Sequence, residues 1–411
     1  MKSDKTTPNV PTLRFPNYNG EWQKTVMGKV CSFRKGYGIA KDDLATDGTP
    51  CILYGELYTT YKTAIAKTIK SKTSIQSKSL VYSKKDDVII PCSGETAEDI
   101  ATSICVPYDG VLLGGDLTIV HSDLDGAFLS NQINSVRKYD IARIAQGKSI
   151  VHLQADDLKK IFIFYPSIQE QRKISAFIDK IDKRIEIQNK IISKYETLIK
   201  GLKHQLYTKK IRFYSHSEIS FSKWEKKQLG EILSISTEKN GSRYSKEKIL
   251  SVSDEYGVVN QIRLQGKSFA GQDISNYKVV KSGQIIYTRS PLAAKPFGII
   301  KIVGVETGIV SPLYIVNTVK KGNDALFIYY LFDSPESTNN YLKPLVRAGA
   351  KHTMNISNDE WLSGTVTVPC LEEQEMIAEF LESIDKKISF EKKILEKLRE
   401  QKTYLLSEMF I

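Results

Sequence analysis

One long segment of this amino-acid sequence occurs twice. The stretch from Pro166 to Tyr207 aligns without a gap onto the stretch from Pro369 to Phe410, with every position displaced by 203. The opening of each half recurs as well, because Trp22 in EWQKTVMG corresponds to Trp224 in KWEKKQLG, displaced by 202. A period of about 200 residues is far longer than the roughly 20–50 residues of a solenoid or propeller repeat. The chain is therefore predicted to be a duplicated architecture.

Each copy of the repeated segment has the period of a coiled-coil helix. Apolar residues recur at alternating spacings of four and three, interrupted at the equivalent positions Gln188 and Glu391. This 3.5-residue period predicts a left-handed coiled-coil seam. At the start of the first copy, the Ser167 hydroxyl is expected to cap the amide of Glu170 while the Glu170 carboxylate reaches back. The predicted seam residues are Ile174, Ile178, Ile181, Ile185 and Ile192 in the first copy and Ile377, Leu381, Ile384, Ile388 and Leu395 in the second.

Two amphipathic helices, each about 60 Å long at roughly 1.5 Å per residue, must bury their seams on a partner. Residues 166–207 carry 9 Lys and Arg against 5 Asp and Glu, whereas residues 369–411 carry 7 against 10. Opposite net charges favour pairing of the two helices with each other. We therefore predict an antiparallel pair within one chain, with a homodimer as the alternative.

The segments outside the helices have a different pattern. Short β-rich runs, such as Val88 to Ile90, Val111 to Leu113 and Ile299 to Val303, alternate with turns rich in Gly, Asp, Ser and Asn. The two segments match each other at their ends but not in their interiors. The predicted fold class is α/β (α+β), with two globular domains, two long helices forming an antiparallel coiled coil, and a pseudo-twofold internal repeat. The predicted boundaries are 1–165 for the first domain, 166–207 for the first helix, 208–368 for the second domain and 369–411 for the second helix.

Composition narrows the class of protein. Hydrophobic residues at 41% and charged residues at 26% are typical of a soluble globular protein. No apolar run approaches the roughly 20 residues of a membrane span, and the N-terminus lacks a signal peptide, so a cytoplasmic protein is expected. The five cysteines form no Cys-x-x-Cys pair, the five histidines show no metal-ligand spacing, and no nucleophile is paired with a base. The chain is not expected to be an enzyme or to bind a metal.

The positive charge favours a polyanionic partner. The net charge is +12, and residues 208–368 alone carry 22 Lys and Arg against 14 Asp and Glu. Basic side chains in loops can neutralise phosphates, and some can read base edges in the major groove. The candidate DNA-binding residues are Arg34, Lys35, Lys70 and Lys72 in the first domain and Arg243, Tyr244, Arg289, Lys295, Lys351 and His352 in the second.

The order of these parts resembles a known family. Two unlike domains, each opened by a Trp followed by a Met-Gly or Leu-Gly step and closed by a Pro-x-x-x-Glu-Gln helix (PSIQEQ, PCLEEQ), resemble the specificity (S) subunit of a type I restriction-modification system. The resemblance covers essentially the whole chain. It implies that each domain is a target recognition domain that reads one half of an asymmetric, bipartite double-stranded DNA sequence. It also implies that the helices act as a ruler and dock two modification subunits.

The same resemblance implies a division of labour. S-adenosylmethionine would be held by the modification (methyltransferase) subunits, and ATP with magnesium by restriction subunits, leaving this chain without a cofactor. The sequence contains no Pro-Pro dipeptide, so it lacks the Asn-Pro-Pro-aromatic motif of adenine methyltransferases. Two other classes stay open. A coiled-coil scaffold would bind proteins without sequence-specific DNA binding, and a methyltransferase or nuclease would itself bind S-adenosylmethionine or metal.

Overall fold

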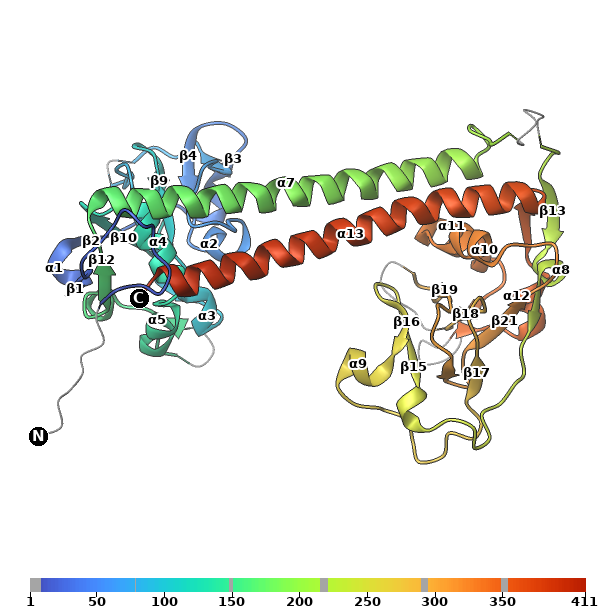
Figure 1. Cartoon of the computed structure of the whole chain (residues 1–411). Helices are drawn as coiled ribbons and strands as arrows, with labels where there is room; N and C mark the ends of the chain where they lie inside the picture. The colour runs from blue at the N-terminus through green and yellow to red at the C-terminus, as the bar shows by residue number, and fades with distance from the viewer. Residues whose placement is uncertain (1–8, 78, 148–150, 215–220, 290–294, 349–353) are drawn as a thin grey trace, which may run out of the picture. The chain divides into compact units, whose positions relative to one another are not determined.

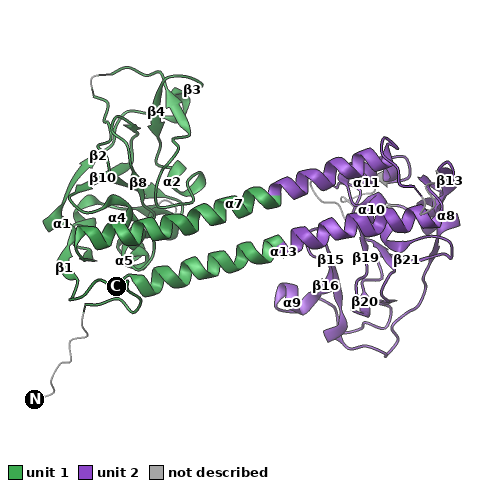
Figure 2. Cartoon of the chain, turned by 45° about the horizontal axis from the view of Figure 1, so that its top comes forward, with its two compact units in different colours: residues 1–192, 391–411 green, residues 193–390 purple. Residues whose placement is uncertain are grey.

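The computed structural model describes residues 9–77, 79–147, 151–214, 221–289, 295–348 and 354–411. The chain divides into two compact units. Unit 1 comprises Met1–Ile192 with Glu391–Ile411, and unit 2 comprises Ser193–Phe390. Each unit therefore holds one globular domain and one part of each long helix, as the colours of Figure 2 show.

The two domains share a frame. Among the described residues, each unit has a four-stranded antiparallel sheet, with strand order β2-β10-β6-β8 in unit 1 and β14-β21-β18-β19 in unit 2 (Figure 1). A separate two-stranded ladder joins the start of each domain to its end, β1 to β12 and β13 to β24. The frame strands of unit 1 are β1 (Gln23–Val26), β2 (Cys31–Lys35), β6 (Asp87–Pro91), β8 (Ile104–Val106), β10 (Leu117–Ser122) and β12 (Phe162–Tyr165). Those of unit 2 are β13 (Glu225–Gln228), β14 (Leu233–Ile235), β18 (Ile285–Tyr287), β19 (Ile300–Ile302), β21 (Ile315–Val319) and β24 (Thr365–Val368).

Short helices occur at matching places in the two frames. In unit 1, α4 covers one sheet face, where Val88, Ile90 and Val120 pack with Leu129 and Ile133 in one buried cluster. Because side chains alternate along a strand, Ile89 and Ile119 point to the opposite face and join a second cluster. The helices of unit 1 are α1 (Met27–Val30), α4 (Gly126–Asn134), α5 (Lys138–Ile144) and α6 (Ala155–Leu158). Their counterparts in unit 2 are α8 (Leu229–Ile232), α10 (Ala325–Phe332), α11 (Pro335–Leu342) and α12 (Asn358–Ser363).

The two interiors differ, as the patchy sequence match predicts. Unit 1 inserts a second sheet in the order β3-β5-β4-β9, whereas unit 2 inserts the hairpin β15-β16 and the ladder β17-β20. The additional elements of unit 1 are η1 (Lys41–Asp43), β3 (Leu44–Ala45), β4 (Thr49–Ile52), α2 (Glu56–Thr59), β5 (Ser71–Thr73), β7 (Ser93–Gly94), α3 (Ala97–Ile100), β9 (Leu112–Leu113) and β11 (Val151–His152). Those of unit 2 are η2 (Lys246–Lys248), β15 (Leu250–Ser253), β16 (Gly257–Asn260), α9 (Gln261–Gln265), β17 (Lys278–Val280), β20 (Gly308–Val310), β22 (Arg347–Ala348) and β23 (Met354–Asn355).

The repeated segments form the two long helices α7 (Ile168–Tyr207) and α13 (Leu371–Met409). Within each unit the parts of α7 and α13 lie side by side and run in opposite directions (Figures 1 and 2). All ten predicted seam residues are buried or half-buried. In unit 1 an ion pair also joins the two helices, with Lys402 Nζ of α13 2.6 Å from Asp182 Oδ1 of α7. None of the described helices is both long and apolar enough to cross a membrane.

The predicted start of the first helix is half right. The Ser167 hydroxyl accepts a hydrogen bond from the Glu170 amide at 3.4 Å, as expected. The Glu170 carboxylate does not reach back to the cap. It binds Arg14 instead, with Arg14 Nε 2.7 Å from Oε1 and Nη2 2.8 Å from Oε2, because an arginine fork satisfies a buried carboxylate better than one amide does.

The end of each helix inserts an aromatic ring into the domain of its unit. In unit 1, Phe410 packs against Phe128 and Trp22, with ring centroids 5.1 and 6.4 Å apart. In unit 2, Tyr207 occupies the equivalent place against Phe327 and Trp224, at 6.2 and 6.5 Å. The two tryptophans that open the halves of the sequence therefore line the seats for the helix ends.

Replacing Tyr207 with Phe is expected to stabilise unit 2 by about 1 kcal/mol. Its buried hydroxyl has no hydrogen-bond partner among the described residues, and burial raises the pKa of this phenol. Phe410 fills the equivalent seat without a hydroxyl, so Phe410→Tyr is the matched control and should destabilise unit 1. Urea unfolding of both variants measures the effect. A loss of stability in the Tyr207→Phe variant would contradict this account.

Candidate nucleic-acid interface

The Glu-Gln pair of each Pro-x-x-x-Glu-Gln motif fastens a long helix to its domain. Gln171 Nε2 donates to the Pro166 carbonyl at 2.8 Å, and its Oε1 accepts from the Asp125 amide at 2.9 Å. The Asp125 carboxylate in turn caps α4 by accepting from the Phe128 amide at 2.8 Å. Unit 2 repeats every bond with Gln374, Pro369, Asp324 and Phe327, at 2.9, 3.0 and 2.7 Å.

The glutamate of each motif is fully buried and is held by an arginine that precedes the opening Trp of its domain in the sequence. Glu373 accepts from Arg212 Nε at 3.0 Å, from Arg212 Nη2 at 2.6 Å and from Trp224 Nε1 at 3.2 Å. The hydrogen bonds to the carboxylate raise the pKa of Arg212. These arginines were missed from the sequence. A signal was present, because Leu13-Arg14-Phe15 recurs as Ile211-Arg212-Phe213.

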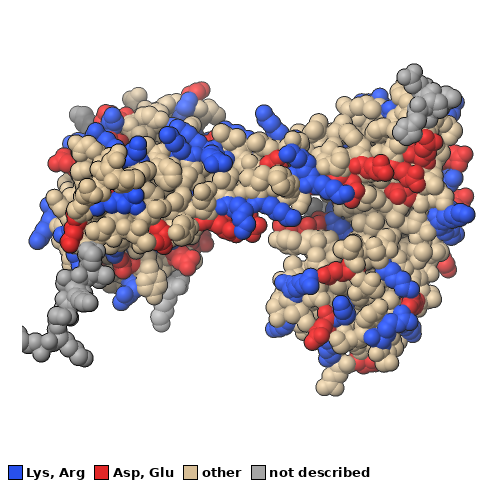
Figure 3. Space-filling model, viewed as in Figure 1, with Lys and Arg blue, Asp and Glu red and all other residues tan. Residues whose placement is uncertain are grey.

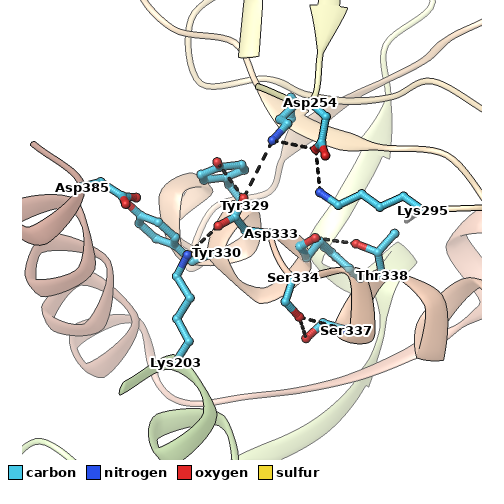
Figure 4. A network of polar contacts seen from close by, with 12 residues as sticks. Lys203, Asp254, Lys295, Tyr329, Tyr330, Asp333, Ser334, Ser337, Thr338 and Asp385 are labelled. Carbon is cyan, nitrogen blue, oxygen red and sulfur yellow. Dashed lines mark hydrogen bonds and ion pairs between the residues drawn. The ribbon is translucent and has the colours of Figure 1, made fainter. Parts of the chain in front are cut away.

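In unit 2 a polar network links the domain to both helices (Figure 4). Asp333, at the end of α10, lies 2.5 Å from Lys203 of α7 and accepts from the Tyr329 hydroxyl at 2.9 Å. The Tyr330 hydroxyl donates to Asp385 of α13 at 2.7 Å. Burial would raise the pKa of Asp333, but the charge and hydrogen bond of Lys203 outweigh it and hold that pKa below its ordinary value. The helices are thus tied to the domain by charge as well as by packing.

This network also engages one of the predicted DNA-binding residues. Lys295 is only 4% exposed and lies 2.7 Å from Asp254, whose carboxylate is also 3.2 Å from Lys301 (Figure 4). A buried lysine paired in this way is a structural group, and its ammonium is not presented to a partner.

The candidates of unit 1 lie in two settings. Arg34, on β2, is ion-paired with the buried Asp87 and donates to the Tyr82 carbonyl at 3.1 Å, yet a third of its side chain stays exposed. Lys35, Lys70 and Lys72 are exposed, and Lys72 lies 3.8 Å from Asp47. An exposed ion pair at this distance holds the lysine only weakly, so these three side chains are available to phosphates.

The candidates of unit 2 are more varied. Arg243 is exposed and ion-paired with Glu238, whereas the ring of Tyr244 packs on the apolar cluster of Ile249, Val279 and Ile309. Arg289 has a positive φ of 56° and donates to Asn358 Oδ1 at 3.0 Å, and burial lowers its pKa. Lys351 and His352 lie outside the described residues. Figure 3 shows Lys and Arg side chains spread over both units on the face in view, interspersed with Asp and Glu.

The frame with its helix seats is shared with known proteins. The model of the type I restriction modification DNA specificity domain matches residues 19–197 and again residues 222–400. The chain belongs to this family. The two matched ranges include both Trp seats and most of both long helices, so the family model describes the frame found in each unit.

Individual relatives agree with the family. The chain is 26% identical over 279 residues to the specificity subunit of the type I restriction enzyme MjaVIII of Methanocaldococcus jannaschii, covering 64% of each chain. It thus spans slightly less than two thirds of the length of that relative. The S subunit of a type I restriction-modification system from M. genitalium has a similar fold, with a TM-score of 0.60, 17% identity and coverage of 98% of this chain and 99% of that one. A chain from a structure concerned with complex assembly of the type I R-M system gives a TM-score of 0.53 at 15% identity, covering 95% and 97%.

Proposed function

We propose that this chain is the DNA-recognition subunit of a type I restriction-modification complex. One observation carries the proposal: two domains share a frame, and the family model matches both, but their inserted elements differ. Two domains with the same frame but different inserted elements suit a bipartite, asymmetric DNA target, since two identical domains would read a palindrome. The exposed lysines and the net charge of +12 suit the phosphate backbone.

The partners would be two modification subunits, joined by restriction subunits. Ile187 on α7 and Phe390 on α13 occupy equivalent positions, displaced by 203, and are 56% and 57% exposed. Large apolar side chains exposed at both copies of one position suit a partner that binds twice. In this proposal the partners hold S-adenosylmethionine, ATP and magnesium, the chain carries out no chemical step, and the complex works in the cytoplasm.

The test is co-expression of the chain with its modification subunit in a host without other adenine methylation. Single-molecule methylome sequencing should show one asymmetric motif with two specified halves and a fixed spacer, with a methylated adenine in each half. Mass measurement of the purified complex should show two modification subunits per chain. Copurification without any methylated motif or sequence-dependent DNA affinity would instead support the scaffold function and refute the proposal.

A further inference from the structure

The two four-stranded sheets carry three polar side chains at the same three places. In unit 1 they are Arg34, Asp87 and His121, and in unit 2 they are Ser236, Gln284 and Thr318; we call each set the sheet trio. The strand register makes the sets equivalent. Ser32 faces His121 and donates to its carbonyl at 3.3 Å, and Ser234 faces Thr318 and donates to its carbonyl at 3.4 Å.

A turn before the central strand confirms the match. The Lys84 amide donates to Asp87 Oδ2 at 2.8 Å, while the Asp87 amide donates back to the Lys84 carbonyl at 3.0 Å. In unit 2 the Lys281 amide donates to Gln284 Oε1 at 2.8 Å, and the Gln284 amide donates back at 3.1 Å. The backbone at this point is thus the same in both units, and the side chains differ.

In unit 1 the trio is charged. Asp87 is fully buried, accepts from His121 Nδ1 at 2.7 Å, and is ion-paired with Arg34. The side chains of Arg34 and His121 remain 34% and 38% exposed. A buried carboxylate therefore holds a guanidinium and an imidazole in fixed orientations at the surface, which reduces the side-chain entropy lost when they bind a ligand.

In unit 2 the trio is neutral. Gln284 Nε2 donates to Thr318 Oγ1 at 3.0 Å, Thr318 is exposed and Ser236 is half-buried. The frame therefore folds at this point with a neutral amide and two hydroxyls. The same place of the frame thus carries an ion pair in unit 1 and neutral side chains in unit 2, so the charged trio is particular to unit 1.

Exposed lysines occur close in sequence to both trios. Lys84 and Lys85 precede Asp87, and Lys281 precedes Gln284, although the Lys281 ammonium is ion-paired with Glu238 at 2.7 Å. Each trio also lies on the sheet face that packs on the elements inserted in its domain. It shares that face with Ile89 and Ile119 in unit 1 and with Ile286 and Val316 in unit 2. The trios are thus on the variable side of the frame.

We propose that the sheet trio discriminates bases, and that Arg34, braced by Asp87, reads a guanine in the half-site of unit 1. Guanine is the base whose major-groove edge offers two acceptors, N7 and O6, to an arginine fork. The hydroxyls and amide of the unit 2 trio cannot make this contact, so the corresponding place in the other half-site accepts a different base. This inference rests on the proposed function, because it names residues that would specify the DNA target.

The test transplants the neutral trio into unit 1 of the full chain, in complex with its modification subunits. The variant carries Arg34→Ser, Asp87→Gln and His121→Thr, three side chains that unit 2 accommodates in the same register. Methylome sequencing should show that one guanine of one half-site is no longer required, with discrimination at that position reduced on the order of ten- to a hundred-fold. The other half-site and the spacer should be unchanged.

A second variant separates base reading from phosphate binding and guards against misfolding. Arg34→Lys keeps the charge next to Asp87 but loses the fork, so it should also relax the guanine requirement. An unchanged motif in both variants overturns the inference. So does an affinity that falls equally for all sequences with a smaller salt dependence, because that result marks a phosphate contact. If the unmodified complex itself gives no bipartite motif, the proposed function has failed rather than the role of the trio.

Discussion

Replacing Arg212 with Met is expected to destabilise unit 2 by about 3–5 kcal/mol, because it leaves the Glu373 carboxylate buried without its cation. Glu373 is 0% exposed, and Trp224 would be its one remaining side-chain donor among the described residues. The first turn of α13 and the Trp224 seat should open together, because Glu373 belongs to that turn and its carboxylate accepts a hydrogen bond from Trp224. Urea unfolding measures the loss, and hydrogen exchange locates it at the start of α13.

Two variants control this prediction. Arg263→Met removes an exposed partner of Glu306, with side chains 78% and 42% exposed, and should cost less than about 1 kcal/mol. Adding Glu373→Gln to Arg212→Met should restore part of the loss, because a neutral amide is less costly to bury than an unpaired carboxylate. If Arg212→Met costs no more than Arg263→Met, the buried pair does not hold the helix to its domain.

The parts of the fold that follow from local periodicity were predictable from the sequence. The heptad pattern predicted a helix starting near Pro166 and ending at Tyr207, and the structure has α7 over Ile168–Tyr207. The frame shared by the two domains was predictable because the duplicated halves carry equivalent residues at a nearly constant separation in the sequence, 202 or 203 positions. The fold class and the family follow from the same two signals, and both are confirmed.

Contacts between distant segments were harder to predict, because no local pattern encodes them. Glu170 looked like a capping residue, and only the structure shows that Arg14, 156 positions away, takes its carboxylate. Lys295 looked like a loop lysine, but Asp254 from the β15-β16 hairpin pairs with it. His121 was given no role, because its link to Asp87 depends on the register of β10 and β6. Charge and loop position thus selected basic residues without revealing which of them are already paired.

The second large effect is expected on stability when Gln188 and Glu391, the polar residues that interrupt the apolar seam, are replaced. Gln188 Nε2 donates to Glu391 Oε2 at 2.5 Å and to the Glu391 carbonyl at 3.0 Å, and both residues are at least nine-tenths buried in unit 1. Gln188→Leu should cost about 1–3 kcal/mol, because it removes a donor from a buried carboxylate. The double variant Gln188→Leu with Glu391→Leu should instead be as stable as the original chain or more stable by about 1–4 kcal/mol, because the whole polar pair is replaced by apolar packing.

Stability is not the only quantity that the double variant should change. A polar pair at one seam position specifies register and partner, since it is satisfied only when the two residues meet. With leucine at both positions, the seam can also pair with a second chain, so sedimentation should detect a larger fraction of dimers in the double variant than in the original chain. Urea unfolding of the two single variants and the double variant completes the cycle. A double variant that is less stable than either single variant would show that the buried pair stabilises the coiled coil outright and does not act mainly through register.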